Sequence, residues 1–350
     1  MIRQLHRLQR HVPAFGPNAL ALAVYAEPDG DGFVLRSAAE QGYEGVACVD
    51  DAARAAVLYS EIWRRHAFPW ARERAEGLLA FVCAMQNEDG AFVNFIADWS
   101  GRRQLQTPTS WPGGVSWQAR ALHALASGVS AFGDDGYAGA FERGLRAFDA
   151  ATPQLDVLAL ATLATHEYWR ASGERHAATR SLGWAEAIAA ARIGDVLPDR
   201  EGDTGVHLWG HLQEAAVARV GAAFGRDDLV EIAANSADAI LAPAVRAAFP
   251  GTGTLPFDVS STVCDLDGVA AATGRERYAH LASLARAWFD GRNAARTPIY
   301  DRERGLVRDG IDGDRASNNS GAESNIEGAL ALLDTLPREA YSFGSPGAIN

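Results

Sequence analysis

The sequence is short of cysteine, of long apolar runs and of net positive charge, and each shortage excludes a class of protein. Three cysteines among 350 residues do not make the disulfide framework typical of small secreted domains. No apolar run approaches the roughly 20 residues that a membrane-spanning helix needs, so we expect no membrane partner. A net charge of -12 argues against a nucleic-acid-binding surface.

Sequence motifs for bound cofactors are missing as well. The chain has no phosphate-binding loop, no dinucleotide fingerprint and no nucleophile elbow, and we expect no cofactor. The basic and then apolar N-terminus has some features of a signal peptide, but Gly16, Pro17 and Asn18 interrupt its apolar part. We therefore expect a cytoplasmic protein, with secretion or a periplasmic location as the alternative.

Helical periodicity dominates what the sequence does contain. Apolar residues recur at the spacing of one helix face in ten segments, whereas short alternating stretches such as 90–98, which could form strands, are few. The predicted helices cover residues 50–66, 71–86, 116–132, 155–172, 176–192, 206–224, 228–245, 265–274, 278–291 and 321–336.

The connections between these helices are of two lengths. Short turns rich in Gly and Asp lie near residues 67, 133, 172, 225 and 273, and long loops cover 87–114, 192–205, 243–263 and 292–320. If each short turn closes an antiparallel hairpin, five hairpins follow one another from 44 to 291, and their long loops gather on one side. A sixth hairpin would pair 321–336 with another segment, for which 18–27 is the candidate.

This arrangement predicts an all-α protein, an (α/α)6 toroid with a few short strands in the long loops. No long loop has the composition of a flexible linker, so we expect a single domain over 1–350, with a flexible segment at 1–16 and a C-terminal tail at 337–350. An open helical solenoid is the alternative, but the sequence shows no fixed repeat period.

In such a ring the first helix of every hairpin would start at the same mouth. The residues near these starts include the acidic residues Asp50, Asp51, Asp156, Asp265, Asp267 and Glu323, together with Trp117, Arg120, His207, Trp209, His211 and Asn325. The first long loop adds Asn94, Asp98, Trp99 and Trp111. Hydrolysis of a glycosidic bond needs two carboxyl groups, and indole rings cover the apolar faces of sugars. The mouth therefore suggests carbohydrate chemistry.

Each of these residues also has a purely structural explanation. Acidic residues at a helix N-terminus satisfy free backbone N–H groups and the helix dipole. Asp50 lies four residues before Arg54, the spacing of an ion pair within one helix. Glu323 follows Ser320 at the spacing of a capping box. Large aromatic residues such as Trp117 and Trp209 are commonly core residues.

The segment around His207 and His211 has some features of a metal site. His207, His211 and Glu214 fall on one face of a predicted helix, and Cys48 and Cys264 could add ligands if they reached the same cavity. Leu208 stands where the zinc motif H-E-x-x-H needs a glutamate. We therefore predict no metal and interpret these histidines as polar lining.

Four motifs together resemble a known family. The stretches "GVACVDDAARAAVLY", "DGAFVNFIADWSG", "GGVSWQARALHALA" and "NNSGAESNIEGALALL" are similar to the α-helical domains of six-hairpin glycosidase type in bacterial carbohydrate-related proteins. The match runs from about Gly42 to Leu336. The resemblance implies an (α/α)6 toroid and a carbohydrate-linked role, without an agreed catalytic assignment. The matching positions are Asp50, Asp51, Arg54, Asn94, Asp98, Arg120 and Glu323. The loop "QLQTPTSWPGG" departs from the pattern and suggests a different substrate.

The first functional hypothesis is a glycoside hydrolase acting on an oligosaccharide or polysaccharide fragment. The predicted catalytic pair is Asp50 or Asp51 together with Asp98. Asp265 and Glu323 are the alternative catalytic candidates. The predicted substrate-binding residues are Asn94, Trp99, Trp111, Trp117, Arg120, His207, Trp209 and His211.

Two alternatives stay open on the same scaffold. A polysaccharide lyase or a sugar epimerase would use a base next to an acidic C–H, for which His207, His211 or Tyr43 could serve. A non-catalytic glycan-binding or scaffold domain would need the tryptophans but not the carboxylates.

Overall fold

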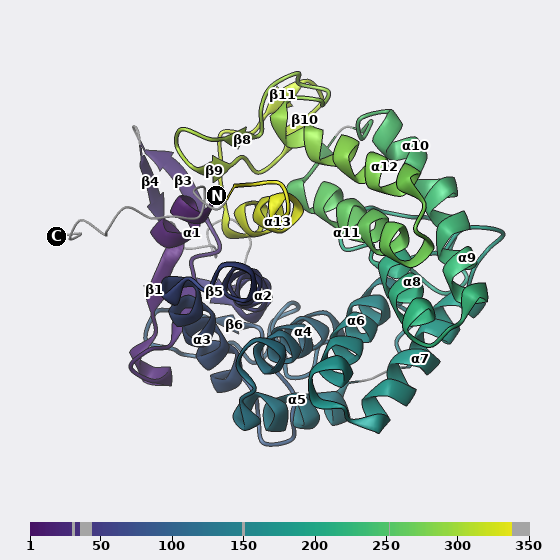
Figure 1. Ribbon diagram of the computed structural model, residues 1–350. Helices are drawn as coiled ribbons and strands as arrows, with labels where there is room; N and C mark the ends of the chain where they lie inside the picture. Colours follow the sequence, from purple (N-terminus) through teal and green to yellow (C-terminus); the bar gives the residue numbers. More distant parts are fainter. Residues whose placement is uncertain (30–31, 36–43, 149–150, 252, 338–350) are drawn as a thin grey trace.

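Helical hairpins close into a ring in the computed structural model, which describes residues 1–29, 32–35, 44–148, 151–251 and 253–337 (Figure 1). Six helices surround the centre, and each contacts the next until the last returns to the first. In ring order they are α2 (Val49–His66), α4 (Val115–Phe132), α6 (Leu155–Ser172), α8 (Gln213–Ala223), α11 (Pro256–Thr273) and α13 (Ala322–Leu332). The predicted all-α (α/α)6 toroid is confirmed.

The outer layer packs against this inner ring. Its helices are α1 (Ile2–Leu8), α3 (Pro69–Ala84), α5 (Asp135–Ala147), α7 (Arg175–Ala190), α9 (Asp227–Ser236) and α12 (Glu276–Arg286). Helix α9 continues through a π-helical turn, Ala237–Leu241, into α10 (Ala242–Arg246). Among the described residues, no helix combines the length and the apolarity needed to cross a lipid bilayer.

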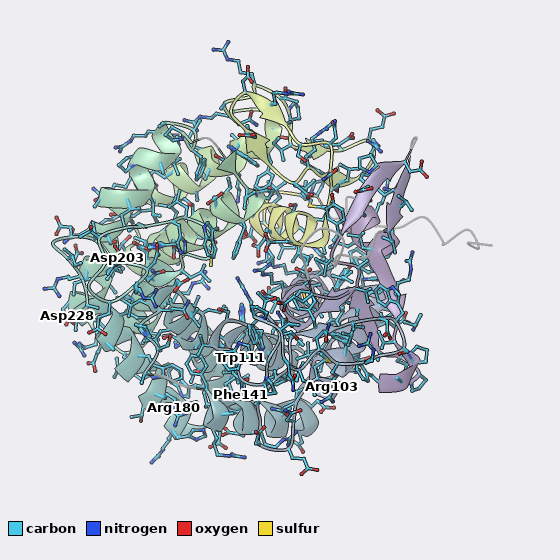
Figure 2. The ribbon with its side chains drawn as sticks, turned by 180° about the vertical axis from the view of Figure 1, so that it is seen from behind. Arg103, Trp111, Phe141, Arg180, Asp203 and Asp228 are labelled. Atoms are coloured by element: carbon cyan, nitrogen blue, oxygen red, sulfur yellow. The ribbon has the colours of Figure 1, made fainter. Side chains whose placement is uncertain are left out.

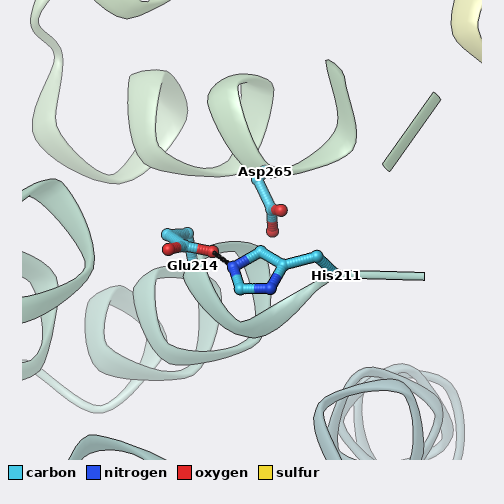
Figure 3. Close-up of side chains that lie close together, drawn as sticks. All are labelled: His211, Glu214 and Asp265. Atoms are coloured by element: carbon cyan, nitrogen blue, oxygen red, sulfur yellow. Dashed lines mark ion pairs between the residues drawn. The ribbon is translucent and has the colours of Figure 1, made fainter. Parts of the chain in front are cut away.

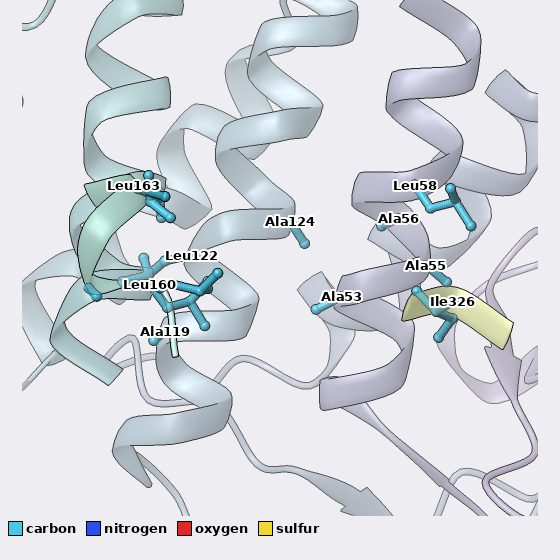
Figure 4. Close-up of a cluster of buried hydrophobic side chains, with 14 of the residues drawn as sticks. Ala53, Ala55, Ala56, Leu58, Ala119, Leu122, Ala124, Leu160, Leu163 and Ile326 are labelled. Carbon is cyan, nitrogen blue, oxygen red and sulfur yellow. The ribbon is translucent and has the colours of Figure 1, made fainter. Parts of the chain in front are cut away.

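The inner helices are buried around most of their circumference because both neighbours in the ring and an outer helix cover them. Alanine and leucine fill these contacts, and Figure 4 shows side chains of α2, α4 and α6 in one cluster with Ile326 of α13. Small alanines let the helices approach closely, while each buried leucine stabilises the fold by roughly 1.5–3 kcal/mol.

The short turns form as their sequences predict. Gly133, Gly173 and Gly274 each follow an inner helix with a left-handed backbone, φ between 64° and 78°, which glycine adopts without strain. Asp134 then caps α5, because its side chain accepts hydrogen bonds from the backbone N–H groups of Gly136 and Tyr137.

The strands are short and lie in the N-terminal region and the long loops. Two-stranded antiparallel pairs join β1 to β2, β3 to β4, β5 to β6 and β8 to β9, and β10 pairs with both β11 and β7. Their bounds are β1 (Gln9–His11), β2 (Leu20–Leu22), β3 (Ala26–Asp29), β4 (Gly32–Leu35), β5 (Ala47–Cys48), β6 (Phe95–Ile96), β7 (Gly253–Thr254), β8 (Tyr300–Asp301), β9 (Leu306–Val307), β10 (Ile311–Asp312) and β11 (Arg315–Ala316).

Two predicted helix starts are wrong, and both errors move candidate residues. The segment predicted as a helix over 206–224 is helical only from Gln213, so His207 and His211 lie in the preceding loop. The helix predicted over 265–274 begins at Pro256, so Asp265 and Asp267 lie well inside α11 and not at its start. Proline at the first helical position supplies the backbone angle for a helix start.

The N-terminal region also differs from the prediction. Residues 18–27 contribute to β2 and β3 and form no helix, and the partner of α13 in the sixth hairpin is α1. Within 1–16, the segment expected to be flexible, Leu5, Leu8 and Val12 are fully buried. Tyr43 and most of the expected tail, 338–350, lie outside the described residues.

Candidate active site

All six inner helices bring their first turn, or the loop just before it, to one cavity at the mouth of the ring. This mouth cavity has a volume of about 340 Å³. Its acidic and basic lining residues are Asp50, Arg54, Arg120, Asp156 and Glu323, and its aromatic lining residues are Trp209 and Phe257. The predicted convergence of helix starts therefore exists, and Asp50, Arg120, Trp209 and Glu323 are the predicted site residues that line this cavity.

Arg54 is the centre of the charge network in the mouth cavity. Its buried guanidinium lies 2.5 Å from Glu323 Oε2, 3.4 Å from Glu327 Oε1, and 3.7 Å from one oxygen each of Asp50 and Asp51. A second arginine, Arg120, places its Nε 3.2 Å from Asp50 Oδ1. Two guanidinium groups are thus shared among four carboxyl groups, and the cavity has no spare positive charge for an anionic ligand.

The adjacent residues Asp50 and Asp51 have different roles in this network. Neither side chain caps α2, because the cap is Cys48, whose sulfur accepts a hydrogen bond from the Asp51 backbone N–H at 3.4 Å. Asp50 is 30% exposed and faces the mouth cavity, whereas Asp51 is buried. Burial raises the pKa of Asp51 to about 7, in spite of the opposing effect of Arg54.

Phe257 forms the apolar floor under the two arginines, and sequence reasoning missed it. Its ring centroid lies 4.5 Å from Arg54 Cζ and 5.2 Å from Arg120 Cζ, within the range of cation–π contacts. Burial and the nearby charge of Arg54 lower the pKa of Arg120. The proline at 256 was the available signal, because it marks the helix start that places Phe257 at the mouth.

An aromatic platform stands on the α8 side of the mouth cavity. The rings of His207 and Trp209 are stacked, with centroids 3.8 Å apart and an interplanar angle of 5°. Trp209 is 48% exposed, an unusual degree for a tryptophan, and it lines the cavity. The backbone N–H of His207 donates to Asp199 Oδ2 at 2.6 Å, and its Nε2 lies 3.7 Å from the same oxygen.

Asp199 connects the platform to a buried layer beneath it. Although burial opposes ionisation, the hydrogen bond from His211 lowers the pKa of Asp199, so this carboxylate stays charged. His211 places Nδ1 2.6 Å from Asp199 Oδ1 and is fully buried. Asp265 is also fully buried, so neither His211 nor Asp265 lies at the surface of the mouth cavity.

The other predicted residues support the mouth from outside its surface. Asn94 is buried, and its side chain accepts from the Asp50 backbone N–H at 3.2 Å. Trp117 is buried and donates to the Phe92 carbonyl at 2.9 Å. Trp99 is partly buried against the core. These three residues position the loop and the helix starts and do not line the cavity.

The first long loop also carries Trp111 and Asp98. Trp111 is 46% exposed and packs edge-on against Trp117, and it lies nearest the ring centre among the residues labelled in Figure 2. Asp98 is exposed and pairs with Arg102 at 2.9 Å. The structure does not bring Asp98 to the mouth cavity.

A second cavity, of about 470 Å³, opens at the other end of the inner helices. It shares Arg54, Arg120 and Phe257 with the mouth cavity, so this layer separates the two. On its far side His123 Nε2 lies 3.7 Å from Glu167 Oε2. Burial, with the charge of Arg120, lowers the pKa of His123 to about 3, and burial raises that of Glu167 to about 7.

Comparison with known proteins identifies the fold. No family model and no curated protein matches the chain. The crystal structure of a sugar epimerase from a ruminal bacterium is similar with a TM-score of 0.72 and 15% identity, over 96% of each chain. Cellobiose 2-epimerase from Spirochaeta thermophila matches with a TM-score of 0.69 and 12% identity, over 95% of this chain and 92% of that one.

A glycoside hydrolase family 9 endoglucanase, J30, is also similar, with a TM-score of 0.54 and 14% identity, over 82% of this chain and 72% of that one. These structures share the six-hairpin glycosidase-like fold with the present chain, as the sequence motifs imply.

Proposed function

We propose that the protein is a carbohydrate-active enzyme that epimerises or isomerises a neutral sugar in the mouth cavity. A sugar ring presents an apolar face that the exposed Trp209 indole can cover, while the surrounding carboxylates and guanidinium groups hydrogen-bond its hydroxyls. The substrate is neutral because Arg54 and Arg120 already pair with acidic side chains. The structural neighbours named as epimerases match over nearly their whole length, which supports this reaction class.

The observation that carries the reaction type is the imidazole of His207 beside the cavity. Its Nδ1 is buried, which leaves Nε2, 3.7 Å from the Asp199 carboxylate, as the nitrogen available to a substrate. The negative charge of Asp199 beside this nitrogen would stabilise the imidazolium that forms when Nε2 accepts a proton. We therefore assign His207 the role of general base.

Epimerisation next to a carbonyl requires one proton to leave and one to return. In the open-chain sugar, His207 would take the proton from the carbon beside the carbonyl, and the C–H electron pair would form an enediolate. Epimerisation is completed when solvent delivers a proton to the opposite face of that carbon and His207 releases its own proton to solvent. Return of the proton from His207 to the neighbouring carbon instead gives the isomeric ketose or aldose. Arg120 lines the cavity, and while it pairs with Asp50 it would donate a hydrogen bond to the developing negative oxygen.

Proton exchange with solvent tests this proposal directly. We would incubate the protein with mannose, glucose and cellobiose in D2O and follow the C2 proton by NMR. Solvent deuterium should enter at C2 while an isomeric sugar appears. His207→Gln should lower kcat by roughly 10²–10⁴-fold, the usual contribution of a general base. His176→Gln changes an exposed histidine away from the ring centre and should keep full activity.

Glycoside hydrolysis is the second candidate, and one residue favours it. Asp156 lines the mouth cavity with Asp50 and Glu323, and burial raises its pKa, as a general acid requires. Release of new reducing ends from oligosaccharides without deuterium exchange, lost in Asp156→Asn, would establish hydrolysis and exclude epimerisation. An unsaturated, ultraviolet-absorbing product would indicate a lyase, and sugar binding without turnover would indicate a glycan-binding domain.

A further inference from the structure

Three fully buried side chains meet between α8 and α11, below the mouth cavity (Figure 3). His211 comes from the loop before α8, Glu214 from the first turn of α8, and Asp265 from the middle of α11. One ligand-type atom from each lies within 4.8 Å of the others. These residues, here the buried triad, play no part in the proposed reaction.

Every member of the buried triad has one polar atom fixed by a neighbour. His211 Nδ1 lies 2.6 Å from Asp199 Oδ1, Glu214 Oε1 accepts from the Ser236 hydroxyl at 2.5 Å, and Asp265 Oδ1 accepts from the Ala215 backbone N–H at 2.7 Å. These bonds set the orientation of each side chain and leave its second polar atom pointing inward.

The three inward atoms have no hydrogen-bond partner among the described residues. They are His211 Nε2, Glu214 Oε2 and Asp265 Oδ2. Nε2 and Oε2 lie 2.8 Å apart, yet they are not aligned for a hydrogen bond. Two atoms that are close but not aligned with each other are arranged as ligands that converge on a third point.

The negative charge of the buried triad favours the binding of a cation. Glu214 pairs with the His211 ring at 2.8 Å, so the fully buried Asp265 carboxyl is the one that no ion pair offsets among the described residues. The nearby guanidinium of Arg219 donates to the Cys264 carbonyl and sulfur and not to Asp265. An uncompensated buried carboxylate is strongly destabilising. One imidazole nitrogen and two carboxylate oxygens are common ligands of zinc, and a histidine whose other nitrogen bonds a carboxylate is the usual form of a zinc ligand.

We propose that His211, Glu214 and Asp265 bind a divalent transition-metal ion of the zinc class, which joins α11 to the start of α8. The sequence predicts no metal there, because Leu208 stands where a known zinc motif needs a glutamate and because a single helical face would combine His207 with His211. In the structure His211 turns inward and Asp265, predicted at a helix start, supplies the third ligand. Because the site is structural, its test does not depend on any enzymatic activity.

Metal content and thermal stability test the site on the whole chain. We would purify the protein without a polyhistidine tag, measure its metals, remove them with dipicolinate, and add back Zn²⁺. We expect close to one zinc per chain, a lower Tm after removal and recovery with Zn²⁺. Co²⁺ added to the stripped protein should give the visible absorption of a four-coordinate site. Purified protein without metal, whose Tm responds to neither Zn²⁺ nor chelator, overturns the proposal.

A variant distinguishes the metal from bound protons. Asp265→Asn has the shape of a protonated aspartate but binds zinc poorly. With a metal site, this variant should lose the zinc and the response of Tm to Zn²⁺. Asp267→Asn, two residues along α11, removes the partner of Arg286 and should keep the zinc response. If Asp265→Asn matches or exceeds the wild-type Tm, protons neutralise the triad and the proposal is wrong.

Discussion

At the residue scale, Arg54 holds together the acidic side chains around the mouth cavity. One buried guanidinium contacts four carboxyl groups drawn from α2 and α13, helices that are far apart in sequence and adjacent in the ring. Four acidic groups around one cation repel one another, so the most deeply buried of them are neutral over part of the pH range.

Asp51 gives the first prediction at this scale. Its pKa of about 7 lies above the ordinary value near 3.9, so the folded state holds the proton more tightly than the unfolded state. The stabilisation from that proton is complete below about pH 4 and is lost as the pH rises through 7. Asp51→Asn, which needs no proton, should raise the free energy of unfolding at pH 8 by at most about 4 kcal/mol, with no gain at pH 4.

Urea denaturation at the two pH values measures this difference. The control is Asp314→Asn, which changes an exposed carboxylate and should leave the pH dependence of stability as in the wild type. A loss of stability in Asp51→Asn that is equal at both pH values would show that Asp51 acts as an ionised partner of Arg54.

The sequence predicts part of the candidate site and misses the rest for identifiable reasons. Asp50, Arg120 and Glu323 could be found because each lies in the first two turns of an inner helix whose periodicity is clear. Phe257 was missed because the serines and threonines that follow it give the start of α11 the composition of a loop. In the structure Ser260, Ser261 and Thr262 are buried, and the two serines line the second cavity, where polar residues are an exception to helix patterning.

At the element scale, the close approach of α8 and α11 depends on one small residue. A Cβ added at Gly268 would lie 3.0 Å from Ala215 Cα and 3.2 Å from Ala215 Cβ. Backbone at that distance cannot move aside as a flexible side chain does. We expect Gly268→Ala to separate α8 from α11 and to destabilise the protein by about 1–3 kcal/mol, the usual cost of overpacking.

Gly183 provides the matched control within the same protein. It lies inside α7, and a Cβ added there would meet no atom within 4 Å. Gly183→Ala should therefore stabilise the protein by roughly 0.5–1 kcal/mol through helix propensity. Opposite shifts of Tm for the two variants, measured by circular dichroism, check the prediction. Equal shifts would show that helix propensity outweighs packing at Gly268.

At the scale of the whole molecule, the ring makes the first residues part of the core. Helix α1 packs on α13, and Leu5 and Leu8 are fully buried. We expect Leu5→Ala to cost 2–5 kcal/mol, the range for leucines deep in a core and far above that of a frayed end. Guanidinium denaturation should show one transition at a lower midpoint. Arg10→Ala, at an exposed position, should change stability little.

The architecture could be predicted because the alternation of short and long connections fixes a closed ring without any knowledge of side-chain contacts. The sixth hairpin could not be predicted in the same way, because its two helices lie far apart in the sequence and no local pattern links them. Short strands in the long loops were predicted, and β6 falls within the stretch 90–98 that could form one. The positions of the others could not be predicted, since they hold only two residues each and depend on their partners.

Closing the ring through α1 and α13 has a consequence for biosynthesis. The hydrogen bond from Gln4 to the Ser320 carbonyl joins residues 316 positions apart. At the translation rates of about 5–20 residues per second, the apolar face of α1 waits roughly 15–60 s for its partner to be made. A nascent chain of this protein therefore carries an unpaired apolar surface on α1 until α13 has been made, and its yield in a cell should depend on chaperones that shield that surface.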